Sequence, residues 1–121
     1  RSGVVARNLA GATNLQELIE VIRNARLVVA NDTSAIHIAA ATSTSAICLL
    51  GGGHFGRFLP YQVESKEVKR LPNIQIHKMD CYGCNWQCIY TQSIKETVPC
   101  IENISVDHVF IECAKALSLT V

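Results

Sequence analysis

The sequence lacks a strong excess of charge of either sign. Its 121 residues include 11 Lys and Arg against 10 Asp and Glu, which gives a net charge of +1 at neutral pH. A protein that binds nucleic acid or an anionic membrane through its charge carries a basic excess, so we expect neither kind of partner on electrostatic grounds. An uninterrupted apolar run of about 18 residues or more, long enough to cross a bilayer, is also missing from the sequence.

Signals for processing and repetition are missing as well. The first residues, RSGVVARNLAG, have neither an initiator methionine nor the apolar core of a signal peptide, so we expect a piece of a longer protein. We find no internal repeat and no low-complexity tract. Apolar residues make up 49% of the chain and charged residues 17%, which favours one folded globular domain.

What the sequence does contain is an alternation of short apolar runs and helical patterns. Residues 27–30 (LVVA) and 46–50 (AICLL) show no polar alternation, which predicts strands covered on both faces. Residues 11–26 predict a helix before the first run, and the Ala-rich residues 33–41 predict a second helix between the runs. This order predicts an α/β fold, a Rossmann-like parallel sheet with helices on both faces.

The pattern is weaker elsewhere. A capping box at the start of the first helix can pair Thr13 with Gln16 or Asn14 with Glu17. Residues 64–70 predict a charged surface segment, and residues 73–78 alternate like a short strand. The chain ends in a predicted helix with an apolar stripe, formed by Val106, Val109, Phe110, Cys113, Ala114 and Leu117.

The stretch NDTSAIHIAAA, residues 31–41, places polar side chains where the first strand gives way to the second helix. Ligands of parallel sheets bind beyond the carboxyl ends of the strands, and a helix N-terminus attracts phosphate. Thr33 and Ser34 add hydroxyl groups there, and His37 lies one turn further on the same helix face. Asp32 would accept hydrogen bonds from sugar hydroxyls or orient His37. A phosphorylated sugar would satisfy all four side chains.

A plainer interpretation stays open for the same residues. Asp, Thr and Ser are common N-caps that stabilise a helix by about 1 kcal/mol, and His37 would then be a core histidine. Capping and ligand binding account equally well for the spacing. They differ in one respect, because a cap alone needs no histidine one turn later.

Cysteine is abundant, with six residues. Four of them follow the spacing C-x2-C-x3-C-x11-C, and four thiolates can hold Zn²⁺ in a tetrahedron. Free buried thiols, or a single disulfide formed during handling, are the alternatives. The four candidate ligands are Cys81, Cys84, Cys88 and Cys100, whereas Cys48 and Cys113 are predicted to pack as inert apolar side chains.

Residues 25–52, ARLVVANDTSAIHIAAATSTSAICLLGG, resemble the glycosyltransferase family that contains the bacterial lipopolysaccharide heptosyltransferases. That family has an apolar strand, then Asp, Ser or Thr, Gly, two residues, His and a small-residue helix, followed by a strand that ends in Gly. Residues 8–26 match its preceding loop and helix, and CYGCNWQC…CIENISVDHV resembles its cysteine-containing tail and last helix. The resemblance covers nearly the whole chain.

The resemblance implies a GT-B fold of two Rossmann-like lobes. Residues 1–121 would be the C-terminal, nucleotide-sugar-binding domain, and the N-terminal acceptor domain with its acidic catalytic base would be absent. The full-length enzyme would transfer a sugar from an ADP-heptose-like donor to a lipopolysaccharide-type or other glycan acceptor. It would work in the cytoplasm, at the inner face of the membrane as a peripheral protein. Transfer would require no cofactor, and the sequence has no Asp-x-Asp motif for a metal.

The resemblance also implies a role for each matching position. The diphosphate would meet the first turn of the second helix, His37 would stabilise the leaving group, and Asp32 would face the sugar. The base would lie near the loop that ends at Thr13. The implied donor-binding residues are Thr13, Asp32, Thr33, Ser34, Ala35 and His37.

The chain departs from the family pattern in two places. Ser34 stands where the family usually has Gly, and GGGHFGRFLPY replaces a Gly-Pro-Thr style loop. For His54 and Arg57 there are two interpretations, contact with the donor or acceptor and a place in a charged surface loop, and we expect the surface loop. We expect Trp86 over local apolar surface. Two other functions remain as alternatives: a non-catalytic, zinc-stabilised interaction module, and another Rossmann-like domain that binds a phosphate ligand.

Overall fold

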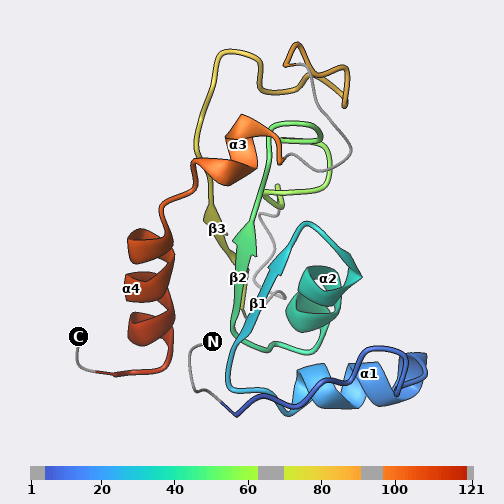
Figure 1. Ribbon diagram of the computed structural model, residues 1–121. Coiled ribbons are helices and arrows are strands. Elements are labelled where there is room, and N and C mark those ends of the chain that lie inside the picture. The colour runs from blue at the N-terminus through green and yellow to red at the C-terminus, as the bar shows by residue number, and fades with distance from the viewer. Residues whose placement is uncertain (1–4, 63–69, 91–96, 120–121) are drawn as a thin grey trace.

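The computed structural model describes residues 5–62, 70–90 and 97–119. Figure 1 shows a small sheet with helices packed around it. The elements, in chain order, are α1 (Leu15–Arg23), β1 (Val28–Asn31), α2 (Ser34–Ala41), β2 (Ala46–Leu49), β3 (Asn73–Gln75), α3 (Pro99–Glu102) and α4 (Val106–Ala116).

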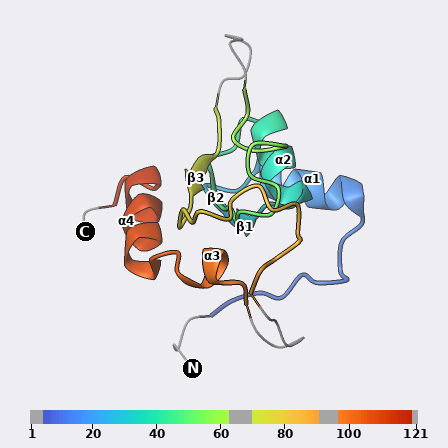
Figure 2. The same cartoon turned by 90° about the horizontal axis from the view of Figure 1, so that it is seen from above.

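The three strands form one parallel sheet in the order β1-β2-β3. In this register Val28 lies beside Ala46, and Ile47 lies beside Asn73. Figures 1 and 2 show α1 and α2 on one side of the sheet and α4 on the other. The predicted α/β fold is therefore confirmed, with a Rossmann-like parallel sheet and helices on both faces. Carboxyl ends of parallel strands share one edge, so β1 and β2 bring their following loops together.

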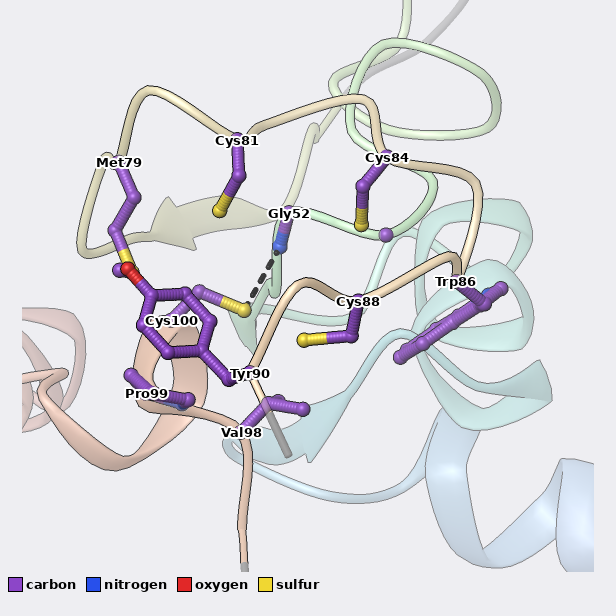
Figure 3. A pocket seen from close by; sticks show the side chains of 11 residues that line it. Gly52, Met79, Cys81, Cys84, Trp86, Cys88, Tyr90, Val98, Pro99 and Cys100 are labelled. Carbon is purple, nitrogen blue, oxygen red and sulfur yellow. Dashed lines mark hydrogen bonds between the residues drawn. The ribbon is translucent and has the colours of Figure 1, made fainter. Parts of the chain in front are cut away.

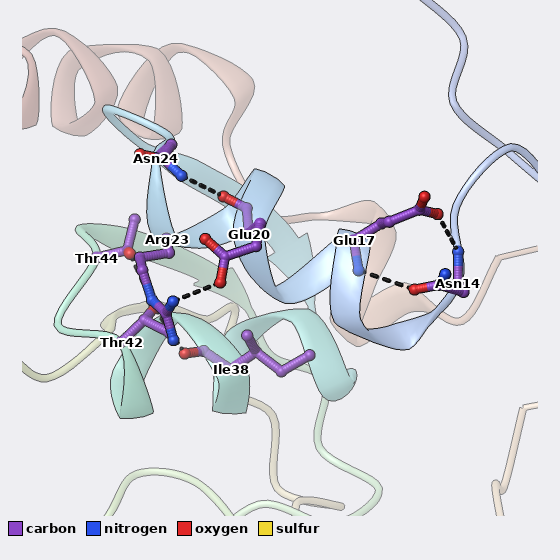
Figure 4. A network of polar contacts seen from close by, with 8 residues as sticks. All are labelled: Asn14, Glu17, Glu20, Arg23, Asn24, Ile38, Thr42 and Thr44. Carbon is purple, nitrogen blue, oxygen red and sulfur yellow. Dashed lines mark hydrogen bonds and ion pairs between the residues drawn. The ribbon is translucent and has the colours of Figure 1, made fainter.

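Helix α1 begins with a reciprocal capping box. The Asn14 side chain accepts a hydrogen bond from the Glu17 N–H at 2.9 Å, and the Glu17 carboxylate accepts one from the Asn14 N–H at 2.8 Å (Figure 4). Of the two predicted pairings, the structure thus has Asn14 with Glu17. The helix buries Ile22 and packs against α2, which it holds against the sheet.

Strand β2 occupies the centre of the core, and β1 lies at an edge. Ala46, Ile47 and Cys48 are all buried, which confirms that residues 46–50 are covered on both faces. The same prediction is wrong for residues 27–30. Val28 packs toward α2, but Val29 points to the opposite face, where α4 packs on β2, and it is 46% exposed.

The later segments follow the predictions in part. Residues 73–75 form the expected strand, and α4 is the expected last helix. Its apolar stripe is only partly buried, because Ala114 lies in the core while Val106 and Phe110 are exposed. The predicted charged segment at 64–70 lies, except for Arg70, outside the described residues. Among the described helices, none is both long and apolar enough to cross a membrane.

Candidate functional site

The N-terminus of α2 opens at the carboxyl end of β1. Asp32 follows the strand, and Thr33 is the N-cap with extended backbone. The Thr33 side chain makes no capping hydrogen bond within the described chain, so it does not play the purely structural role that the alternative interpretation gives it. The N–H groups of a first helical turn need other acceptors and carry partial positive charge. This end of α2 therefore suits an anion.

His37 is held between a carboxylate and a phenol. Its Nε2 lies 3.5 Å from the Asp32 Oδ1, and its Nδ1 lies 2.5 Å from the Tyr61 hydroxyl. Burial, and then the negative charge of Asp32, raise the pKa of Tyr61, so this phenol stays protonated at neutral pH. With Tyr61 donating to Nδ1, the ring proton of neutral His37 sits on Nε2 and faces Asp32. The predicted orienting role of Asp32 thus has the geometry it needs.

Two adjoining hollows lie at this end of the sheet. The helix hollow, about 300 Å³, lies over the start of α2, and the strand hollow, about 250 Å³, lies beyond the ends of β1 and β2. Asp32, Thr33, His54 and Trp86 line both hollows. The remaining lining residues are Ser34, His37 and Phe58 in the helix hollow, and Asn31, Leu49, Leu50, Gly51 and Ile101 in the strand hollow.

The structure brings most of the predicted donor-binding residues together. Asp32, Thr33, Ser34 and His37 share the helix hollow. Ser34 begins α2 with helical backbone, so the side chain in place of the family's glycine leaves the start of the helix intact. Ala35 follows in the first turn, and its side chain packs against the core, which leaves its backbone N–H for a ligand. Thr13 lines neither of the two described hollows, and its place near a base stays a prediction.

Residues outside the 31–41 stretch, some of which the sequence analysis did not place at the site, also contact it. His54 was expected in a surface loop, but it is half-buried and lines both hollows, whereas Arg57 is exposed as expected. Trp86 was expected to cover apolar surface, yet it is 61% exposed and also lines both hollows. Tyr61 contacts His37 from the same loop as His54. The run Gly51–Gly53 was the available signal, since consecutive glycines allow another segment to approach closely.

Cys48 lies under the site but has no reactive thiolate. Burial, and then the negative charge of Asp32, raise the pKa of its thiol to about 12. Its side chain is fully buried in β2. A nucleophilic cysteine requires the opposite shift, so the predicted packing role of Cys48 fits the structure.

The four candidate zinc ligands line one small apolar space, which we call the cysteine cavity. Figure 3 shows the sulfurs of Cys81, Cys84, Cys88 and Cys100 turned toward this cavity. The Cys100 sulfur accepts a hydrogen bond from the Gly52 N–H at 3.4 Å. Nevertheless, no group of three or more His, Cys, Asp or Glu side chains in the described chain is placed to hold a metal ion. Zinc binding by these thiols stays a prediction.

Comparisons with known proteins add a family to this geometry. The model of glycosyltransferase family 9 (heptosyltransferase) matches residues 2–86, which include both hollows' shared residues. Lipooligosaccharide heptosyltransferase 2 of Haemophilus influenzae is 50% identical over 44 residues. These residues are 36% of this chain and 13% of that protein, so the match spans a small part of the relative. No solved structure matches the chain.

Proposed function

The chain belongs to glycosyltransferase family 9, the heptosyltransferases, and on that premise we propose that its two hollows bind a nucleotide-sugar donor. In this proposal residues 1–121 are the donor-binding domain of a GT-B enzyme. The complete enzyme transfers a sugar from an ADP-heptose-like donor to a lipopolysaccharide-type acceptor, in the cytoplasm at the inner face of the membrane. The name of the Haemophilus influenzae relative supports this acceptor class.

One observation carries the proposal: an N-terminus of α2 without a side-chain cap opens into the same hollow as Asp32 and His37. A diphosphate placed there would receive hydrogen bonds from the first-turn N–H groups and from the Thr33 hydroxyl. Asp32 would repel a phosphate placed directly against it. Its carboxylate is suited to sugar hydroxyls beside the diphosphate, in the strand hollow that it also lines.

The same arrangement would assist the transfer step. When the bond between the sugar and the diphosphate breaks, negative charge grows on the departing diphosphate. The dipole of α2 and the imidazole of His37 would stabilise this charge more strongly in the transition state than in the bound donor. Asp32 and Tyr61 would keep the imidazole in place without reorganisation during the reaction. The dipole of α2, its first-turn N–H groups and His37 would thus stabilise the charge on the diphosphate, and the proposal requires no cofactor for transfer. The predicted structural zinc ion at the cysteine cavity has no part in the transfer step. Metal analysis of the purified protein tests whether it is bound.

Calorimetric titration of the chain with ADP tests the donor site. We expect ADP to bind, and His37→Ala to weaken binding about tenfold, because the diphosphate would lose the Nε2–H of His37, which faces Asp32 across 3.5 Å in the free chain, as a hydrogen-bond donor. His77→Ala is the matched control, since His77 is exposed and lines neither described hollow, and it should bind ADP like the wild type. A chain that binds no nucleotide would contradict the proposal and would favour an interaction module instead.

A further inference from the structure

We infer that Trp86 is a donor-binding residue, and that its indole face carries the ring of the transferred sugar opposite Asp32. The inference rests on the proposed function and assigns the sugar of the donor to the strand hollow. Nothing in the sequence pattern of residues 31–41 points to this side chain, which lies in the loop between β3 and α3.

The position of Trp86 joins the two hollows. Together with Asp32 and Thr33, Trp86 lines both the strand hollow and the helix hollow. The His54 ring meets Trp86 edge-on, with ring centroids 5.5 Å apart, and meets Phe58 edge-on at 5.6 Å. All three rings line the helix hollow.

The indole is fixed before any ligand arrives. It lies so close over Gly53 that a Cβ at that position would stand 2.7 Å from the indole Cδ2. The Asn85 N–H donates to the Gly53 carbonyl at 2.9 Å, which ties the loop to the glycine run. Figure 3 shows Trp86 at one side of the cysteine cavity, on the loop that also carries Cys84 and Cys88. A fixed aromatic surface binds a ligand with little loss of side-chain entropy.

The backbone here is costly for a side chain that serves packing alone. Asn85 and Trp86 both have positive φ, at 50° and 62°, in the left-handed region that few residues other than Gly adopt. Such conformations persist where the surrounding structure enforces them, and they gather at ligand sites. Yet the indole held in this way is 61% exposed, so most of its surface faces away from the protein.

The chemistry of the strand hollow fits a sugar ring. A pyranose has an apolar C–H face and a rim of hydroxyls, and the hollow offers an indole face together with the Asp32 carboxylate. Ser34 and His37, which would meet the diphosphate, line the helix hollow instead. A diphosphate at the start of α2 carries the nucleoside on one side and the sugar on the other, so one of the two lies over Trp86. The Asp32 carboxylate favours the sugar there, because it accepts hydrogen bonds from hydroxyl groups.

The fluorescence of the protein tests this directly, because Trp86 is the only tryptophan. We expect ADP-glucose, used as the probe sugar nucleotide, to change the Trp86 emission strongly, and ADP to change it little. In calorimetric titrations Trp86→Ala should raise the Kd for ADP-glucose about tenfold and leave the Kd for ADP unchanged. Trp86→Phe, which keeps a ring, should restore most of the affinity.

Tyr90→Ala is the matched control, because Tyr90 is a partly exposed ring that lines the cysteine cavity. It should bind both ligands like the wild type, and all variants should have the circular dichroism and melting curve of the wild type. Equal losses for ADP and ADP-glucose in Trp86→Ala would overturn the inference and leave the proposed function standing. Wild-type affinity of Trp86→Ala for ADP-glucose would overturn it in the same way. A wild-type chain that binds neither ligand removes the proposed function as well.

Discussion

At the scale of single residues, burial of the Cys48 thiol in the core makes the free energy of unfolding depend on pH. Its folded pKa of about 12 lies above the ordinary value of 9.0 that we expect in the unfolded chain. Between these values the unfolded chain releases a proton that the folded protein keeps. This thiol's contribution is therefore fully present below pH 9 and declines as the pH rises, by at most about 1.4 kcal/mol per pH unit.

We predict that Cys48→Ala reduces the alkaline loss of stability. The free energy of unfolding, measured with urea at pH 8.5 and at pH 10, should fall less in Cys48→Ala than in the wild type, although the variant is less stable at both values because it leaves a cavity. Ile47→Val is the control, because it trims a buried side chain of the same strand without removing a titratable group, and it should keep the wild-type slope. Identical slopes in wild type and Cys48→Ala would show that this thiol does not titrate as described.

How far the site could be predicted depends on how its residues are linked in sequence. Thr33 and His37 share a helix face because they are four residues apart, and this spacing is readable from the sequence. Tyr61, His54 and Trp86 reach the same place from loops whose path no periodicity encodes. The sequence therefore predicts the local half of the site, and the loops that close it require the tertiary structure.

At the scale of elements, the capping box shows which of two sequence patterns starts α1. Asn14→Ala removes the side-chain acceptor of the Glu17 N–H, so we expect a loss of about 1 kcal/mol in unfolding free energy. Gln16→Ala, which alters only the alternative pairing with Thr13, should change stability by less than about 0.5 kcal/mol. Urea unfolding followed by circular dichroism measures both. A larger loss in Gln16→Ala than in Asn14→Ala would contradict the observed cap.

Local sequence patterns predict the helices and strands themselves. They do not predict which faces of these elements are buried by other parts of the chain. The apolar runs predict β1 and β2, and the intervening Ala-rich segment predicts α2. Whether both faces of a strand are covered depends on where distant helices pack. Helix α4 packs on β2, so Val29 of β1 remains largely exposed although its sequence reads as doubly buried. The exposed Phe110 on α4 has the same cause, since an apolar stripe wider than its contact surface stays partly uncovered.

At the scale of the whole molecule, the proposed chemistry divides between binding and transfer. In the proposed function the described residues would supply groups for a diphosphate and a sugar, and the resemblance implies that the acidic base lies in an N-terminal lobe. On this proposal, donor binding and acceptor activation would therefore be tasks of different lobes.

We predict that the 121-residue chain binds the donor but does not transfer its sugar. With ADP-heptose and a lipopolysaccharide acceptor, a coupled assay should detect no ADP release above that of a sample without protein, because the base that would deprotonate the acceptor hydroxyl is proposed to belong to the N-terminal lobe. A longer protein that includes the N-terminal lobe should release ADP, and His37→Ala in that protein should lower kcat by about 10- to 100-fold, since charge on the leaving diphosphate is then less stabilised. His77→Ala should leave kcat unchanged. Turnover by the isolated chain would place the base among these 121 residues and would require a different division of labour between the lobes.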